Sequence, residues 1–164
     1  MTTRPHSRIL PKIFALLLLS IAPAAAQDEM RLKVTGAALQ SEDVEISLEA
    51  LDDMDQVAFK TTTIWTDGEN QFSGVPLKAL LERLGAEGNE VQMIALNDYA
   101  VSMPISELED DAPIVATRIN GETMSVREKG PFWVIYPFDR DARYSTETNY
   151  SRSIWQLNRL KVIN

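Results

Sequence analysis

Hydrophobic and polar positions along the chain fall into short stretches that are typical of strands, separated by polar turns. Residues 31–35 (RLKVT) alternate between polar and apolar side chains, as a half-buried strand does. Residues 56–65 (QVAFKTTTIW) are β-branched and aromatic, and residues 132–136 (FWVIY) form the continuous apolar run of a buried strand. Further strands are predicted at residues 91–96, 100–103, 114–119, 124–126 and 156–163.

Helical spacing is rarer along the chain than strand patterns are. Four leucines recur at helical spacing between Pro76 and Gly85, and proline and glycine often begin and end a helix. Ser47 is placed to cap a short helix over residues 48–54, and residues 104–108 predict another brief helix. Because strands outnumber helices and their order is irregular, the sequence predicts an α+β fold with a mixed β-sheet and a few short helices.

Polar stretches between these elements predict turns and loops. Asn120-Gly121 lies between two predicted strands and indicates a two-residue hairpin. Residues 64–71 (IWTDGENQ) and residues 97–99 (NDY) are predicted as polar turns. Residues 139–152 form a long polar connection, and long connections of this kind are often functional.

The N-terminus has the pattern of a signal peptide. Three basic residues precede an apolar core over residues 13–22, and three alanines follow at residues 24–26. The apolar run is about ten residues, which is short for a membrane span. We therefore expect cleavage after Ala26, a single domain over residues 27–164 and a periplasmic location, with a retained N-terminal anchor as the alternative.

Charge and composition narrow the classes of function. Without residues 1–26 the chain keeps 13 basic against 24 acidic residues, a net charge of −11 that disfavours nucleic acid and anionic membranes. Residues 127–164 carry seven basic and four acidic residues, unlike the acidic remainder of the chain. This part either forms a separate solvent-exposed face or binds an anionic or polar ligand. The chain has no cysteine, and its one histidine, His6, lies in the signal peptide. A catalytic triad, a thiolate nucleophile and a zinc site of the usual kind are therefore not expected.

Aromatic and hydrogen-bonding side chains gather in the turns and near the C-terminus. Flat aromatic faces beside amide, carboxylate and guanidinium groups suit a planar heteroaromatic ligand, because the faces stack and the polar groups read its edge. The candidate binding residues are Trp65, Asp67, Asn97, Asp98, Tyr99, Tyr150, Arg152, Ser153 and Trp155.

Each candidate also has a purely structural interpretation. Trp133 and Trp155 lie in apolar surroundings and are typical of a core. Asp67 can cap backbone amides in a turn, and Arg152 can pair with a surface carboxylate. The acidic run 107–111 (ELEDD) is expected to be a solvated face, not a calcium site.

An ordered set of motifs resembles the oxidoreductase molybdopterin-binding domain family, which has the sulfite-oxidase-type fold. The matching pieces are TTTIWTDG, FSGVPLKALLERLGA, NDYAVSMPISEL, INGETMSVREKGPFWVIYP and SRSIWQLNRLKV, which together cover residues 45–163. The resemblance implies a sulfite-oxidase-like α+β fold that binds a pterin.

One departure from the family pattern bears on function. Molybdenum enzymes of this family carry a metal-ligating cysteine after the first long strand, where this chain has Trp65 or Thr66. Neither an indole nor a hydroxyl replaces a soft, charged thiolate. Phe132-Trp133 also stands where the family often has an arginine that contacts the cofactor. Molybdenum is therefore not expected.

The resemblance implies the role of the small exported subgroup that lacks the cysteine. That role is to bind a free, reduced pterin and to pass its occupancy to an inner-membrane signalling protein, such as a cyclic-di-GMP synthase or phosphodiesterase or a sensor kinase. Trp65, with Tyr99 or Tyr150, would stack on the ring. Asp67, Asn97 or Asp98 would read its edge, Arg152 and Ser153 would add polar contacts, and Trp155 would line the pocket or belong to the core.

Two alternatives stay open at this stage. The chain could be a molybdopterin-dependent oxidoreductase, or a subunit of one, with an atypical metal site. It could also be an exported structural or adhesive domain that has kept only the fold.

Overall fold

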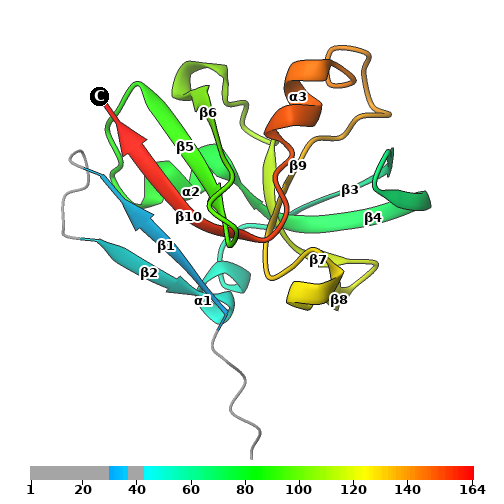
Figure 1. The fold of residues 1–164 in the computed structure, drawn as a ribbon, viewed down its shortest axis with the longest axis horizontal. Helices are drawn as coiled ribbons and strands as arrows, with labels where there is room; N and C mark the ends of the chain where they lie inside the picture. The colour runs from blue at the N-terminus through cyan, green and yellow to red at the C-terminus, as the bar shows by residue number, and fades with distance from the viewer. Residues whose placement is uncertain (1–29, 37–42) are drawn as a thin grey trace, which may run out of the picture.

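The computed structural model describes residues 30–36 and 43–164, and within them two β-sheets pack side by side (Figure 1). The first sheet has the strand order β2-β1-β10-β5-β6. Strands β1 and β10 are parallel, and the other neighbours are antiparallel. The bounds of the strands are β1 Arg31–Thr35, β2 Val44–Ser47, β5 Glu90–Ala95, β6 Ala100–Pro104 and β10 Leu157–Ile163.

The second sheet is antiparallel throughout, in the order β3-β4-β7-β8, with β9 also pairing with β7. Its strands are β3 Val57–Thr63, β4 Thr66–Pro76, β7 Ile114–Ile119, β8 Glu122–Thr123 and β9 Trp133–Ile135. The helices of the described residues are α1 Leu48–Asp52, α2 Leu77–Arg83 and α3 Glu147–Arg152, with the 3₁₀ turns η1 Ile105–Glu107 and η2 Val126–Glu128. The α+β class with a mixed sheet is confirmed.

Strands β7 and β9 of the second sheet are buried on both faces, which explains their apolar side chains. In β9, Val134 belongs to the core between the two sheets, whereas Trp133 and Ile135 belong to a second core on the opposite face. The core between the sheets also contains the leucines of α2, whose helical spacing was read correctly from the sequence. The second core is rich in aromatic rings, and Trp65 and Tyr150 pack against its edge.

Most predicted elements are confirmed within a residue or two. Ser47 caps α1, because its Oγ accepts a hydrogen bond from the Ala50 amide at 3.2 Å. Gly85, with a φ of 60°, follows the end of α2, and Asn120-Gly121 forms the predicted hairpin turn with both φ angles positive.

Two predictions about the polar stretches are wrong. Residues 64–71 are not one long turn, because only Ile64 and Trp65 turn and β4 begins at Thr66. An irregularity in the pairing follows at once, where Gly68 has a φ of 64°. Residues 139–152 are not simply a loop, since α3 ends this stretch. Thr146 caps α3 by accepting from the Asn149 amide at 3.2 Å.

Strand β3 forms one edge of the second sheet. The Asp139 carboxylate accepts from the Thr62 amide at 2.5 Å and from the Thr62 hydroxyl at 2.9 Å. The Asp139 amide in turn donates to the Thr61 hydroxyl at 3.1 Å. These bonds fix the start of the α3-bearing segment on the edge of the sheet.

The expected signal peptide and its cleavage point lie outside the described residues. Within the described ranges, none of the helices has the length and apolar character needed to cross a membrane.

Candidate functional site

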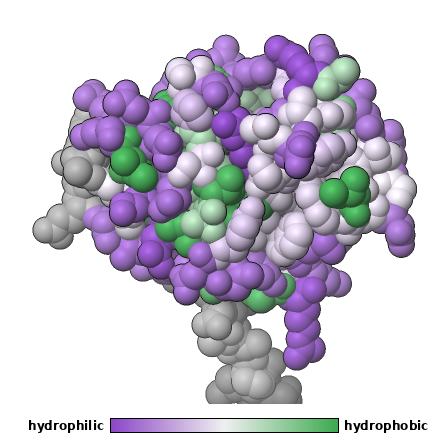
Figure 2. All heavy atoms as spheres, turned by 45° about the horizontal axis from the view of Figure 1, so that its top comes forward, coloured by the Kyte–Doolittle hydropathy of each residue, from purple (hydrophilic) through white to green (hydrophobic). Residues whose placement is uncertain are grey.

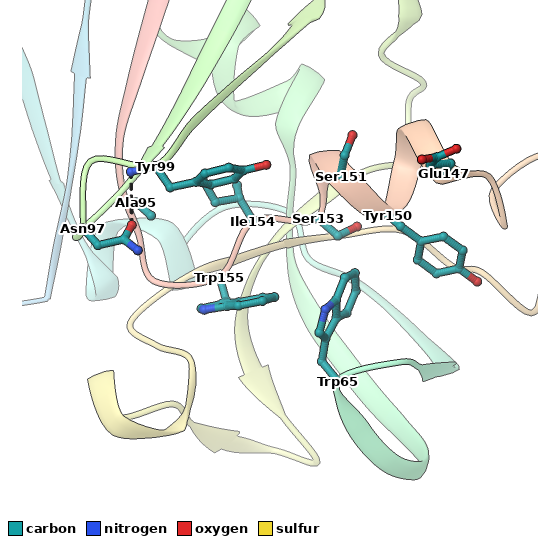
Figure 3. Close-up of a pocket in the computed structure, with 10 residues that line it drawn as sticks. All are labelled: Trp65, Ala95, Asn97, Tyr99, Glu147, Tyr150, Ser151, Ser153, Ile154 and Trp155. Atoms are coloured by element: carbon teal, nitrogen blue, oxygen red, sulfur yellow. Dashed lines mark hydrogen bonds between the residues drawn. The ribbon is translucent and has the colours of Figure 1, made fainter.

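A pocket of about 500 Å³ opens between three segments that are distant in the sequence. Trp65 comes from the β3–β4 turn, Asn97 and Tyr99 come from the β5–β6 turn, and the remaining wall is α3 with the residues after it. In the close-up, Tyr99 and Trp155 lie on opposite sides of the pocket and Trp65 closes a third side (Figure 3). The lining residues are Trp65, Ala95, Asn97, Tyr99, Glu147, Tyr150, Ser151, Ser153, Ile154 and Trp155.

The β3–β4 turn holds Trp65 in place. The Trp65 amide donates to the Thr63 hydroxyl at 3.0 Å, and the Thr63 and Thr66 hydroxyls are 2.8 Å apart across the turn. The indole meets the Trp155 and Tyr150 rings edge-on, with centroid distances of 5.6 Å and 5.9 Å. Aromatic pairs prefer such T-shaped contacts, so these rings help to hold Trp65 in the wall of the pocket.

The β5–β6 turn presents Asn97 and Tyr99. The Asn97 Oδ1 accepts from the Tyr99 amide at 3.1 Å, and Asp98 between them has a φ of 62°, which asparagine and aspartate tolerate. Because Oδ1 is engaged in the turn, the Asn97 side chain offers its NH₂ group as a donor. Tyr99 is 51% exposed.

The segment after α3 is fixed by backbone hydrogen bonds on both sides. The Ile154 carbonyl accepts from the Val134 amide of β9, and the Leu157 amide donates to the carbonyl of Phe132, the residue before β9. The Gln156 carbonyl accepts from the Leu96 amide at 3.0 Å. Trp155 is thereby held next to the β5–β6 turn and stays 38% exposed. Trp133 is fully buried beneath the pocket, where its Nε1 donates to the Ser153 carbonyl at 3.3 Å. The core interpretation is therefore confirmed for Trp133, whereas Trp155 lines the pocket.

The α3 wall combines an aromatic ring with polar groups. Tyr150 stacks on Phe138 with centroids 4.5 Å apart, and so presents its other face and edge. The Ser151 Oγ donates to the Thr148 carbonyl at 2.7 Å, and the Ser153 Oγ donates to the Asn149 carbonyl at 2.8 Å. Glu147 is the one charged side chain among the described lining residues.

Three arginines near the pocket are paired with the acidic run 107–111. Arg152 binds Glu107 at 2.6 Å, Arg143 binds Glu109 at 2.9 Å and Arg140 binds Asp111 at 2.6 Å. We call these three pairs the arginine ladder. The prediction that the run 107–111 is only a solvated face is therefore half right. Its alternate residues Glu107, Glu109 and Asp111 bind the arginines of the α3 segment. The second interpretation of Arg152, as a partner of a surface carboxylate, is the one observed.

The structure brings six of the nine candidate residues to the pocket: Trp65, Asn97, Tyr99, Tyr150, Ser153 and Trp155. Asp67 lies exposed in β4, Asp98 forms the turn backbone and Arg152 is engaged with Glu107, so none of the three is among the lining residues. Sequence reasoning missed Glu147 and Ser151. The signal that was available was Thr146 followed by Glu147, a capping residue before an acidic first turn.

Two buried tyrosines beside the α3 segment have altered acidity. Burial raises the pKa of Tyr136 to about 12, and its hydroxyl contacts the Met103 sulfur at 3.7 Å. Burial and the hydrogen bond to Glu109 raise the pKa of Tyr144. Both phenols are therefore protonated at neutral pH and act as hydrogen-bonding groups of the core, not as bases.

The sequence profile of the oxidoreductase molybdopterin binding domain family matches residues 20–139. The chain belongs to this family. No curated protein matches the chain. The matched residues include Trp65, Asn97 and Tyr99, whereas the pocket residues of α3 and Trp155 lie beyond them.

The sulfite-oxidase-type fold of the family is seen again in the crystal structure of the sulfane dehydrogenase SoxCD from Paracoccus pantotrophus. The two structures superpose with a TM-score of 0.61 at 18% sequence identity, over 82% of this chain and 38% of that chain. The likeness concerns the fold, and the molybdopterin-binding domain described here spans 38% of its neighbour.

The pocket of this molybdopterin-binding domain fits the pterin ring of the family's cofactor better than it fits the cofactor's metal. Aromatic faces and a few polar groups suit the flat ring system of a pterin. The lining residues include no thiolate or imidazole, and no group of three or more metal-ligating side chains occurs within residues 30–36 and 43–164. The side chains present therefore match the pterin ring and supply no soft ligand for a metal.

Proposed function

We propose that this protein is a periplasmic, non-catalytic pterin-binding module. A free, reduced pterin would lie between the Tyr99 and Trp155 rings and against Trp65, with its ring edge near the Asn97 NH₂ group. The observation that carries the proposal is the aromatic pocket. It lies in a domain of a molybdopterin-binding family, and this chain has no cysteine that could ligate a metal there.

We further propose that ligand occupancy is read by an inner-membrane signalling protein. Support comes from two exposed apolar side chains that neighbour pocket residues in the sequence: Ile64, next to Trp65, is 71% exposed, and Leu96, next to Asn97, is 45% exposed. The two side chains belong to the two turns that contribute Trp65 and Asn97 to the pocket, where a partner could contact both the apolar surface and the ligand site. Figure 2 shows separate hydrophobic patches within a largely hydrophilic surface.

Native mass spectrometry of the protein purified from the periplasm tests ligand binding directly. The expected result is a mass increment equal to one pterin, with pterin fluorescence after the ligand is released and oxidised. Stoichiometric molybdenum would overturn the proposal in favour of an oxidoreductase with an atypical metal site. A protein that carries and binds no small molecule would favour an exported structural domain.

Tyr99→Ala tests the placement of the ring. The Tyr99 side chain is half exposed and makes no side-chain hydrogen bond within the described residues, so the variant should fold normally. Loss of one stacking face should weaken pterin binding by about tenfold, since aromatic pairs contribute on the order of 1 kcal/mol. Fluorescence titration measures this, with Ile64→Ala as the matched control. Equal affinity of Tyr99→Ala and the wild type would contradict the placement.

Photo-crosslinking from position 64 tests for a partner. The proposal expects a crosslink to an inner-membrane signalling protein that changes when the pterin is added. A crosslinker at Lys161, exposed in β10 of the other sheet, serves as control. Equal crosslinking from position 64 with and without the ligand would contradict the role of occupancy.

A further inference from the structure

Trp155 receives little support from its own polar groups. Its amide, its carbonyl and its indole nitrogen make no hydrogen bond within the described residues. Its ring packs edge-on against Trp65 and Trp133, with centroids 5.6 Å and 6.2 Å away. The position of Trp155, across the pocket from Tyr99 in Figure 3, therefore depends on the residues on either side of it in the chain.

Gln156, the next residue, has a left-handed backbone with a φ of 52°. In a regular strand, residues two apart lie on the same face. Here Trp155 lines the pocket, whereas Leu157 is fully buried in the core between the two sheets. The left-handed turn at Gln156 explains how two side chains so close in the chain reach different surroundings where β10 begins.

Glutamine is an unusual residue for such a backbone. Glycine takes positive φ angles without strain, and asparagine and aspartate tolerate them, whereas other side chains are disfavoured there. Strained residues persist where the surrounding structure holds them, and they are concentrated at ligand sites. The chain keeps a glutamine at position 156 although a glycine would suit the backbone better, which indicates that the side chain has a use of its own.

Three hydrogen bonds tie Gln156 to two segments beside the pocket. Its amide donates to the Lys129 carbonyl at 2.8 Å, and its carbonyl accepts from the Leu96 amide of the β5–β6 turn at 3.0 Å. Its side-chain Nε2 donates to the Val126 carbonyl at 2.8 Å. A glycine at position 156 would keep the two backbone bonds and lose the third.

The η2 turn, which receives two of these bonds, is itself held together by hydrogen bonds. The Glu128 and Gly130 amides both donate to the Ser125 carbonyl, at 2.9 Å and 2.8 Å. Met124, just before the turn, is buried in the second core. The Gln156 side chain therefore links the pocket segment to a compact turn that is anchored in the core.

Resting on the proposed function, we infer that Gln156 is a positioning residue of the ligand site. Its side-chain amide holds the backbone beside Trp155 against the η2 turn and so keeps the Trp155 ring opposite Tyr99. Gln156 is not among the described lining residues, so it acts through Trp155 and not through a contact with the ligand.

Gln156→Gly removes the side-chain bond and keeps both backbone bonds. Loss of the bond to Val126 destabilises the protein, whereas glycine relieves the left-handed strain, so the stability in urea unfolding should stay close to that of the wild type. Affinity for dihydroneopterin, a reduced pterin, should fall by about threefold to tenfold, the equilibrium equivalent of one net hydrogen bond. Isothermal titration calorimetry without oxygen measures the dissociation constants.

Gln156→Glu is a second variant, which keeps the length of the side chain but replaces the donor by an oxygen. It should weaken binding at least as much as Gln156→Gly, because a carboxylate would face the Val126 carbonyl. Lys129→Gly is the matched control. Lys129 also has a left-handed backbone, with a φ of 73°, and its side chain makes no hydrogen bond within the described ranges. This variant should bind the pterin as the wild type does.

Fluorine NMR of protein labelled with 5-fluorotryptophan follows Trp155 without any ligand. The chain has three tryptophans, and Trp155→Phe assigns the Trp155 signal. In Gln156→Gly this signal should shift or broaden, while the signal of Trp133 in the core should keep its line width. A general loss of structure would broaden both signals, so this measurement separates positioning from folding.

The possible results separate this inference from the proposed function. Wild-type affinity of Gln156→Gly would overturn the inference, because the side chain would then have a structural role only. If Lys129→Gly weakens binding as much as Gln156→Gly does, the η2 turn as a whole is responsible and the role of the Gln156 side chain is refuted. If the wild type does not bind the pterin while the Trp155 signal changes in Gln156→Gly, the proposed function is refuted and the positioning of Trp155 is supported.

Discussion

At the scale of single residues, Gly74 shows how closely two strands of the second sheet approach. It lies in β4 at an irregularity in the pairing with β7. A Cβ atom at this position would be 2.0 Å from the Val115 carbonyl oxygen and 2.6 Å from the Ala116 Cα. Both contacts are with backbone, so a side chain cannot be accommodated by a rotamer change.

Gly74→Ala should therefore destabilise the protein although it adds only one methyl group. Overpacking of this kind costs about 1–3 kcal/mol, because strands β4 and β7 must separate. Urea unfolding measures the change in the free energy of unfolding. Ser73→Ala on the same strand keeps a Cβ atom and should stay within about 0.5 kcal/mol of the wild type. A Gly74→Ala protein as stable as Ser73→Ala would show that the strands can shift freely.

At the scale of elements, the arginine ladder joins α3, through Arg152, and the residues before α3, through Arg140 and Arg143, to the acidic run 107–111. The alternating residues Glu107, Glu109 and Asp111 face the α3 segment, whereas Asp110 points to α2 and binds Lys78 at 2.6 Å. The acidic run thus ties two elements to the body of the protein. One of them, α3, is a wall of the pocket.

Asp111→Asn tests the ladder through its pH dependence. The hydrogen bond from Arg140 lowers the pKa of Asp111, so its ion pair contributes stability above the ordinary carboxyl pKa of about 3.9 and loses it as the pH falls through the lowered value. The Asp111 side chain is 49% exposed, so the loss at neutral pH should be below about 1 kcal/mol. The wild type and the variant should become equally stable in strong acid.

Urea unfolding of both proteins across the acid range measures this convergence. Glu122→Gln, which removes a carboxylate with no ion-pair partner within the described residues, should show no comparable pH-dependent difference. A stability gap between Asp111→Asn and the wild type that is as large in strong acid as at neutral pH would refute the electrostatic origin of the effect.

At the scale of the whole molecule, the sequence predicted the elements better than their assembly. Local alternation and turn residues placed most strands correctly, but the parallel pairing of β1 with β10 joins the two ends of the described chain and leaves no local signal. Helix α3 (ETNYSR) was missed because it is polar and lacks apolar periodicity, so it depends on its Thr146 cap and on the packing of Tyr150.

In the candidate site, too, some residues could be predicted from the sequence and others could not. Aromatic residues such as Trp65, Tyr99 and Trp155 were recognised, because large flat side chains next to turns have few structural uses other than packing or binding. Charged residues were assigned poorly, since the partner of a charge depends on which segments meet in the fold. Arg152 was expected to contact the ligand and instead binds Glu107, while Glu147 lay within a segment read as a loop.

The bond between Asp139 and Thr62 bears on how the protein behaves at high concentration. An edge strand with free amides can recruit a strand of another molecule, and β3 is rich in β-branched and aromatic side chains. Here the carboxylate of a distant segment already takes the Thr62 amide and places a negative charge against the edge. Asp139→Ala should therefore increase self-association, measurable by analytical ultracentrifugation, and an unchanged monomer population at high concentration would count against this role. One side chain would then serve both to position the pocket wall and to keep neighbouring molecules apart.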